Sequence, residues 1–133
     1  MTVADSVLKL CRDQRQGRVA TWLLDIFGVE ICFSREERIN RFFEEAVELA
    51  QSVSMPKENA LRIVEYVYNR PRGVPMQEIG GVSITLLALC HSYDISCDEA
   101  ERQELERALS LDVDQLRAKH NAKADAGIAR RTQ

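Results

Sequence analysis

Three glutamates in one short stretch of the chain have the residue type and the spacing of a divalent-metal site. Glu44, Glu45 and Glu48 stand in the run Arg41-Phe-Phe-Glu-Glu-Ala-Val-Glu48. In a helix, at about 100° per residue, the three carboxylates share about one third of the circumference. Carboxylates this close repel one another. A divalent cation would reverse the sign of that energy, and oxygen-only ligands suit Mg²⁺ or Mn²⁺.

The same spacing also fits an ordinary charged helix surface. Glu37 and Arg41 fall on the same face as the three glutamates. Helix faces rich in glutamate and arginine are common on soluble proteins, where they are solvated and linked by salt bridges. The spacing alone therefore leaves both a metal site and a solvated, salt-bridged face open.

A fourth glutamate, Glu78, stands at the start of a second helical segment. The apolar run of residues 84–90 follows it, and apolar residues point in nearly every direction around this segment. Such a helix is typical of the centre of a bundle. A carboxylate at the end of a buried helix needs a partner, and a cation shared with Glu45 and Glu48 would supply one. The alternative is a first-turn glutamate near the surface, offset by Arg72 or another base.

The elements that must position these acids all have helical patterns. Ser34 is a good N-cap for the segment that carries the three glutamates, Gly28 is a C-cap candidate, and Pro75 fits a first helical turn. We predict helices over residues 18–27, 35–53, 57–69, 75–93, 99–109 and 113–123. No segment has the alternation of a strand or the Gly-rich loop of a Rossmann or P-loop site. The expected fold is an all-α bundle of four main helices with shorter flanking helices.

The apolar residues of the glutamate-bearing helix form one stripe, which we expect to face the core. The stripe consists of Ile39, Phe42, Ala46, Leu49, Ala50 and Val53. With 133 residues the chain has the size of one domain. We assign residues 1–124 to this domain and expect residues 125–133, which lack periodicity, to form a disordered tail.

Composition and charge narrow the class of protein. The net charge is −3, and a dedicated DNA-binding module would carry a basic face, so we expect no nucleic-acid partner. The longest apolar run is too short for a bilayer and no signal-peptide pattern is present, so we expect no membrane partner. Four scattered cysteines fit free thiols in the cytoplasm, and two histidines are too few for a zinc site.

A set of motifs, in order along the chain, resembles the MazG-like all-α nucleoside triphosphate pyrophosphohydrolases, and most of all their phage-type members that act on dGTP and dATP. The motifs are Trp22, Phe27-Gly28, Glu37–Leu49, Arg70–Gly73 and Glu78–Val82. They span roughly residues 18–123, most of the chain. The resemblance implies a MazG-like helical bundle. It also implies metal-dependent hydrolysis of a nucleoside triphosphate, with a purine deoxynucleotide such as dGTP or dATP as substrate, to the monophosphate and pyrophosphate.

The resemblance also implies roles for the acids. The family signature is E-x-x-E followed by E-x-x-D; Glu45 and Glu48 match its first half, and Glu78 matches the start of the second. These three would be the metal ligands, and Glu44 would be a further ligand or the residue that orients or deprotonates water. The aspartate position is Gly81. Water or another acid would fill the gap (Glu65 is a better candidate than Asp94), or catalysis has been lost.

Substrate contacts implied by the resemblance come from basic and aromatic residues. Arg38, Arg41 and Lys119 are candidates for holding phosphates, and Trp22 is a candidate for stacking on a purine. Asn40 is a candidate reader of the base. Surface charge for the basic residues, and a core role for the aromatic residue, are the alternatives.

Three expectations concern partners and competing functions. Family members generally pair or tetramerise, so we expect a homodimer or homotetramer, in the cytoplasm (the host cytoplasm for a phage-encoded chain). A related pyrophosphohydrolase acting on dUTP or a modified nucleotide is one alternative function. A non-catalytic helical oligomer or adaptor that keeps the fold is the other, and Gly81 favours it. The preferred base and sugar and the number of metal ions stay open.

Overall fold

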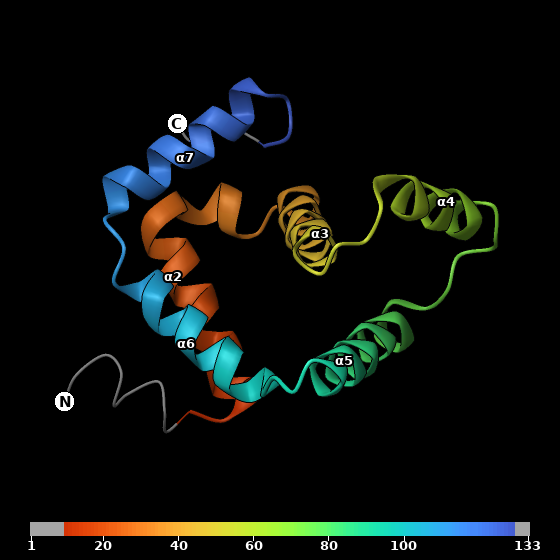
Figure 1. Ribbon diagram of the computed structural model, residues 1–133. Helices are drawn as coiled ribbons and strands as arrows, with labels where there is room; N and C mark the ends of the chain where they lie inside the picture. The colour runs from red at the N-terminus through yellow and green to blue at the C-terminus, as the bar shows by residue number, and fades with distance from the viewer. Residues whose placement is uncertain (1–9, 130–133) are drawn as a thin grey trace. The chain divides into compact units, whose positions relative to one another are not determined.

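The computed structural model describes residues 10–129 of the chain, and this part contains helices and no strand (Figure 1). The helices are α2 (Arg12–Cys32), α3 (Arg35–Ser52), α4 (Lys57–Tyr68), α5 (Pro75–Ser92), α6 (Cys97–Leu109) and α7 (Val113–Asp125). The predicted all-α fold class is confirmed. The finer expectation of a MazG-like bundle with four main helices stays a prediction.

Helix boundaries follow the local sequence signals, with one clear difference at the start of α2, which begins at Arg12 and not at residue 18. Ser34 caps α3 as predicted, since its Oγ accepts a hydrogen bond from the Glu37 N–H at 3.3 Å. The predicted end of a helix at Gly28 is confirmed: its φ of 78° and ψ of 175° are not helical, and a second short helical stretch follows it to Cys32 within the range of α2. Glycine alone adopts this conformation at low cost. Burial of Ile31 and Cys32 holds the residues beyond the interruption in place.

The helices belong to two compact units. Among the described residues, unit 1 contains 10–42 and 98–129, which are α2, the beginning of α3, α6 and α7. Unit 2 contains Phe43–Cys97, which are the rest of α3, α4 and α5. The helix that carries the three candidate glutamates therefore begins in unit 1 and presents them in unit 2.

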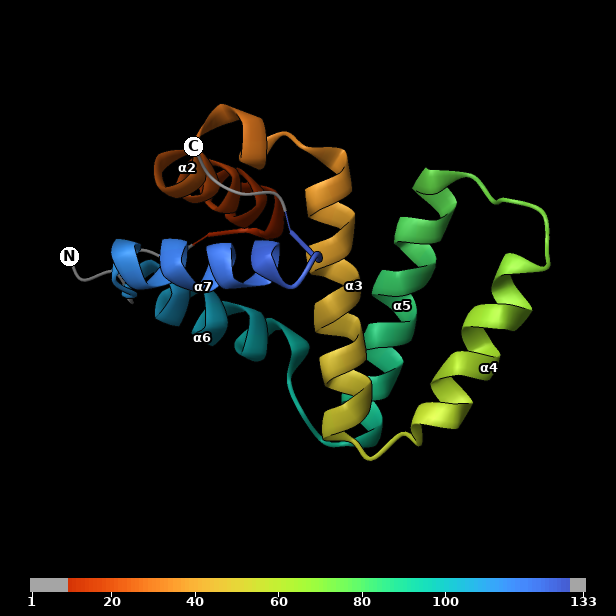
Figure 2. The ribbon, with the colours of Figure 1, turned by 90° about the horizontal axis from the view of Figure 1, so that it is seen from above.

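Unit 1 has a small core, and within it α2 lies beside α7 (Figure 2). The buried apolar residues are Ile26, Ile31, Cys32 and Leu105. Arg117 Nε of α7 donates a hydrogen bond to the Ile26 carbonyl of α2 at 2.8 Å. Three polar side chains, Arg15, Glu37 and His120, are buried as well. The core of this unit therefore depends on paired charges and not only on apolar contacts.

Unit 2 buries none of its residues in the single chain. Our expectation that the apolar stripe of α3 faces a core is wrong: Leu49, in the unit 2 part of the helix, is 39% exposed, and Ile39 and Phe42, in its unit 1 part, are 58% and 48% exposed. The expected central position of α5 is also wrong, because Met76 is 82% exposed and Ile84 66%. An apolar pattern predicts that a helix face is removed from water, but it does not predict which surface packs against that face. Among residues 10–129 these apolar side chains stay exposed.

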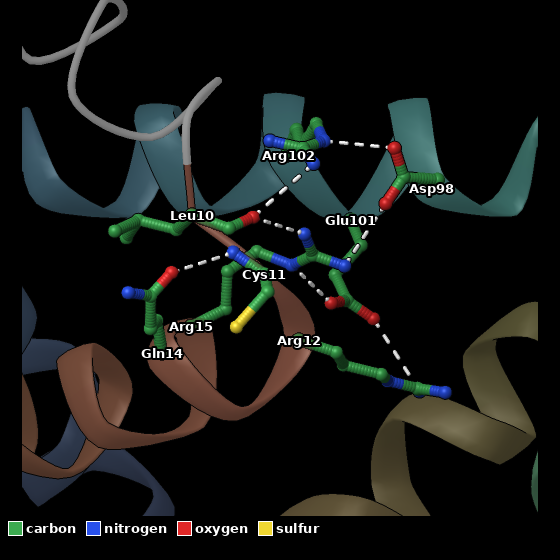
Figure 3. Close-up of polar contacts among 8 residues, drawn as sticks. All are labelled: Leu10, Cys11, Arg12, Gln14, Arg15, Asp98, Glu101 and Arg102. Carbon is green, nitrogen blue, oxygen red and sulfur yellow. Dashed lines mark hydrogen bonds and ion pairs between the residues drawn. The ribbon is translucent and has the colours of Figure 1, made fainter.

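An ion-pair cluster joins α2 to α6 in unit 1 (Figure 3). Arg15 donates to Glu101 at 2.6 Å, to Asp98 at 2.9 Å and to the Leu10 carbonyl at 2.9 Å. Arg102 donates to the other Asp98 oxygen at 2.8 Å and to the same Leu10 carbonyl at 3.2 Å. The buried Arg15 guanidinium thus has acceptors on α6 and on the segment before α2, which satisfies its charge inside the unit.

Acid is expected to weaken this cluster through Asp98. The hydrogen bond from Arg102 holds the pKa of Asp98 below its ordinary value of 3.8, and the charge of Arg15 acts in the same direction. Because the folded-state pKa is the lower one, the stabilisation is present above 3.8 and is lost as the pH falls through the folded-state pKa. We therefore expect the urea midpoint of unfolding to decrease as the pH falls from about 5 to about 2.

Two variants test whether the acid dependence of the urea midpoint comes from Asp98 or from other carboxylates. Asp98→Asn should unfold at lower urea than the wild type at neutral pH, and its midpoint should decrease less on acidification. Asp25→Asn, at an exposed position of α2, should keep the acid dependence of the wild type. An Asp98→Asn protein with the unaltered acid dependence of the wild type would show that the cluster does not contribute to it.

Three further expectations concern the cysteines, membranes and the chain ends. None of the four cysteines, all of which the structure describes, forms a disulfide. No helix within residues 10–129 has the length and apolar character needed to cross a membrane. After α7 the chain turns at Gly127, where φ is 77°. Residues 1–9 of the expected domain and residues 130–133 of the expected tail lie outside the described residues.

Candidate functional site

The three glutamates of α3 lie in its unit 2 portion. The helix is continuous through the whole run, so it presents Glu44, Glu45 and Glu48 at the spacing from which a shared face was predicted. Glu45 and Glu48 are exposed, whereas Glu44 is partly buried. Two carboxylates of this face are therefore open to a ligand from solvent.

Glu78 stands in the first turn of α5, also in unit 2. Its N–H donates to the Val74 carbonyl at 3.0 Å, which closes the first turn. Its side chain is exposed, so our expectation of a carboxylate at the end of a buried helix is wrong. The carboxylate folds back over Gly73: a Cβ atom placed on that glycine would lie 1.8 Å from Glu78 Oε1.

The described residues do not gather these acids into one centre. Within residues 10–129, no group of three or more histidine, cysteine, aspartate or glutamate side chains is placed to hold a metal ion. The donors have the right chemistry, because carboxylate oxygens suit Mg²⁺ and Mn²⁺. The chain thus supplies suitable ligands on two helices of unit 2 without assembling them around a point.

Gly81, which stands where the family signature has aspartate, has free space around it. Gly81 lies inside α5, and a Cβ atom there would meet nothing within 4 Å. Of the two candidate substitutes, Glu65 accepts a hydrogen bond from Asn69 at 3.1 Å within its own region of α4. Asp94 follows α5 in a turn, with φ 54°. Neither takes part in a three-residue metal-binding group among the described residues.

The five candidate substrate-binding residues all belong to unit 1. Asn40 and Lys119 are exposed, and Trp22 is partly buried. Arg38 is partly buried, and its Nε is a buried donor without a hydrogen-bond partner among the described residues. Arg41, by contrast, already binds within the chain: it donates to the Ile128 carbonyl and pairs with Glu37.

Glu37 is the centre of a buried charged cluster that our reading of the sequence missed. Its side chain is 1% exposed, with Arg41 Nε 3.1 Å and His120 Nδ1 3.9 Å from its Oε1. The His120 ring lies 5.0 Å from the ring of Phe27 on α2, centroid to centroid. The alternative that placed Glu37 on a solvated helix face is therefore wrong for this residue. No sequence signal links it to His120, which is on α7 and far along the chain.

Comparisons with protein-family models, with curated proteins and with solved structures give no match to this chain. Membership of the MazG-like superfamily therefore rests on the ordered motifs of the sequence and stays a prediction.

Proposed function

We propose that this chain hydrolyses nucleoside triphosphates to the monophosphate and pyrophosphate, with Mg²⁺ or Mn²⁺ as cofactor and a purine deoxynucleotide such as dGTP or dATP as substrate. The observation that carries the proposal is the carboxylate face of α3. The helix is unbroken through Glu44, Glu45 and Glu48, and the last two are exposed to an incoming ligand. Three acids so close together gain most from a bound cation.

The acids have two tasks in this proposal. Glu45, Glu48 and Glu78 would hold the cation. Glu44, which is partly buried, is either a further ligand or the base that orients and deprotonates the attacking water. When bound, a cation would supply positive charge that offsets the charge developing on the phosphate oxygens.

Among the basic residues, Arg38 stays a candidate for a phosphate contact, as the resemblance to the family implies. Arg41 is weaker, because its guanidinium already serves Glu37 and the Ile128 carbonyl. Lys119 is a second candidate for the phosphates, and Trp22 and Asn40 stay candidates for the base.

The proposal includes a homodimer or homotetramer located in the cytoplasm, or in the host cytoplasm for a phage-encoded chain. Its support is the exposed apolar surface of unit 2, where Met76, Ile79 and Ile84 are 82%, 69% and 66% exposed. Monomeric soluble proteins rarely expose large contiguous apolar patches. A second copy of the chain would remove such side chains from water. Sedimentation of a single monomeric species across the micromolar range would contradict the oligomer.

The activity is tested by incubating the full chain with each deoxynucleoside triphosphate in Mg²⁺ or Mn²⁺. Pyrophosphate and the monophosphate should appear in equal amounts, most rapidly from dGTP or dATP. The same panel with dUTP and modified nucleotides separates the related pyrophosphohydrolases. Release of orthophosphate alone would reject cleavage at the α-phosphorus.

A second candidate function is a non-catalytic helical scaffold. Two observations favour it: Gly81 stands where the family signature has aspartate, and no three-acid metal centre exists among residues 10–129. Binding of Mn²⁺ with a nucleotide discriminates between the two functions, because a scaffold gains nothing from that affinity. Tight binding supports the hydrolase, and its absence together with absent turnover supports the scaffold.

A further inference from the structure

We propose that unit 2 forms its core only when it packs against unit 2 of a second copy of this chain. This inference rests on the homo-oligomer of the proposed function and deepens it, because the second copy becomes a requirement for the folding of α4 and α5. Unit 1 does not share this requirement, since Ile26, Ile31 and Leu105 are buried within it.

Unit 2 has exposed apolar side chains and no core of its own. None of its residues, 43–97, is buried, and sixteen of its large apolar residues are at least 39% exposed. The helices of this unit, which are α3 beyond Phe42, α4 and α5, do not pack extensively on one another. Helices in proteins derive most of their stability from the packing of an apolar face. Unit 2 therefore needs a surface that a single copy of it does not provide.

The exposed apolar area of unit 2 has the size of a stable interface. Complete burial of a large apolar side chain removes roughly 60–120 Å² from water. About half of that area, summed over the sixteen residues, is roughly 500–1,000 Å². Each partner in a stable protein–protein interface buries about 800 Å². A second copy of unit 2 thus offers the area that the first copy leaves exposed.

The directions of these side chains fit the helices of a second copy better than one flat surface. Val82 and Ile84 point about 160° apart around α5, at about 100° per residue, and both are exposed (44% and 66%). Only surfaces on two sides of α5 remove both side chains from water. Helices of the partner unit, interleaved with those of the first, supply two such surfaces. A two-fold axis then gives each copy the same contacts that it gives its partner.

The test is amide hydrogen exchange of the full chain at protein concentrations from nanomolar to high micromolar, with sedimentation velocity on the same samples. At high concentration, where the copies associate, α4 and α5 should exchange slowly. After dilution to the monomer their exchange should approach that of an unfolded chain, because the association that stabilises them is lost by mass action. The exchange of α2 and α7, which belong to unit 1, should not depend on concentration.

Two substitutions at positions of similar exposure in the single chain form a matched pair. Ile84 in α5 is 66% exposed, and Val29 in α2 is 65% exposed. Ile84→Glu should raise the protein concentration needed to protect α4 and α5 by about tenfold or more, because it places a charge against apolar side chains of the partner. Val29→Glu should leave that concentration unchanged. Glutamate is a better helix former than isoleucine, so Ile84→Glu does not weaken α5 by itself.

The other outcomes overturn the proposal. Protection of α4 and α5 that survives dilution to the monomer would remove the folding requirement and leave the oligomer intact. A chain that stays monomeric at every concentration would remove the second copy: protected amides would then mean that the chain covers these helices itself, and unprotected amides would leave a different protein as their partner. Equal behaviour of Ile84→Glu and Val29→Glu would contradict the interface as well.

Failure of the proposed hydrolysis is distinguishable from failure of this inference. Exchange and sedimentation are measured without a nucleotide or a metal ion. A chain that associates as expected but releases no pyrophosphate would therefore overturn only the hydrolysis.

Discussion

Glu48→Gln is expected to lower the turnover of dGTP or dATP by roughly 10²–10³-fold. The substitution keeps the size of the side chain and removes the negative charge that a bound cation needs. Metal ions contribute several kcal/mol of transition-state stabilisation, and about 1.4 kcal/mol corresponds to a tenfold change in rate. Because Glu48 is exposed on α3, the loss should leave helicity intact. Pyrophosphate release at saturating Mn²⁺ measures the effect, and far-ultraviolet circular dichroism monitors the fold.

Glu36→Gln is the matched control. Glu36 is exposed on the same helix, and at about 100° per residue it points opposite to Glu45 and about 120° away from Glu48. The control should keep full turnover, so that a decrease in Glu48→Gln reports the carboxylate face and not the helix. Equal activity of Glu48→Gln and the wild type would remove Glu48 from the site and with it the central support of the proposed function.

Glu37→Ala should destabilise the chain by about 3–5 kcal/mol, the usual cost of removing one partner from a buried ion pair. The Arg41 side chain is only 19% exposed and the His120 side chain 6%, so neither regains full hydration when Glu37 is removed. Urea unfolding at one fixed protein concentration measures the change, since association would alter the apparent stability.

Glu36→Ala provides the comparison for this second prediction. It removes the neighbouring, exposed glutamate of α3 and should alter the free energy of unfolding by no more than about 0.5 kcal/mol. If Glu37→Ala lowers the free energy of unfolding by less than about 1 kcal/mol, packing or hydration compensates for the loss of the buried ion pair.

Local signals in the sequence were sufficient for most of the secondary structure. Ser34 caps α3 because its hydroxyl is one of the few side-chain groups that can satisfy a first-turn N–H. Pro75 starts α5 because its fixed φ suits a first helical turn. Gly28 ends a helical run, as its residue type predicts, because its φ of 78° suits glycine. The short helical stretch after it, which reaches Cys32, has no such local signal. Ile31 and Cys32 of that stretch are buried, and burial is not local.

The candidate site was only partly accessible to the same reasoning. Helical periodicity places Glu44, Glu45 and Glu48 on one face, since that face depends on three nearby residues of one helix. Whether Glu78 is exposed or buried depends on what packs against α5, and the sequence pattern favoured the wrong answer. The space that Gly73 leaves for the Glu78 carboxylate also became visible only in three dimensions.

The glutamates of α3 show most clearly what the sequence determines and what only the tertiary structure decides. By itself the sequence determined that Glu37, Glu44, Glu45 and Glu48 share a side of α3, because helix geometry alone sets those directions. The tertiary structure alone decided that Glu37 is buried beside Arg41 and His120 while Glu45 and Glu48 face solvent. The physical reason is that burial depends on residues far along the chain, here those of α7, whose approach no periodicity encodes.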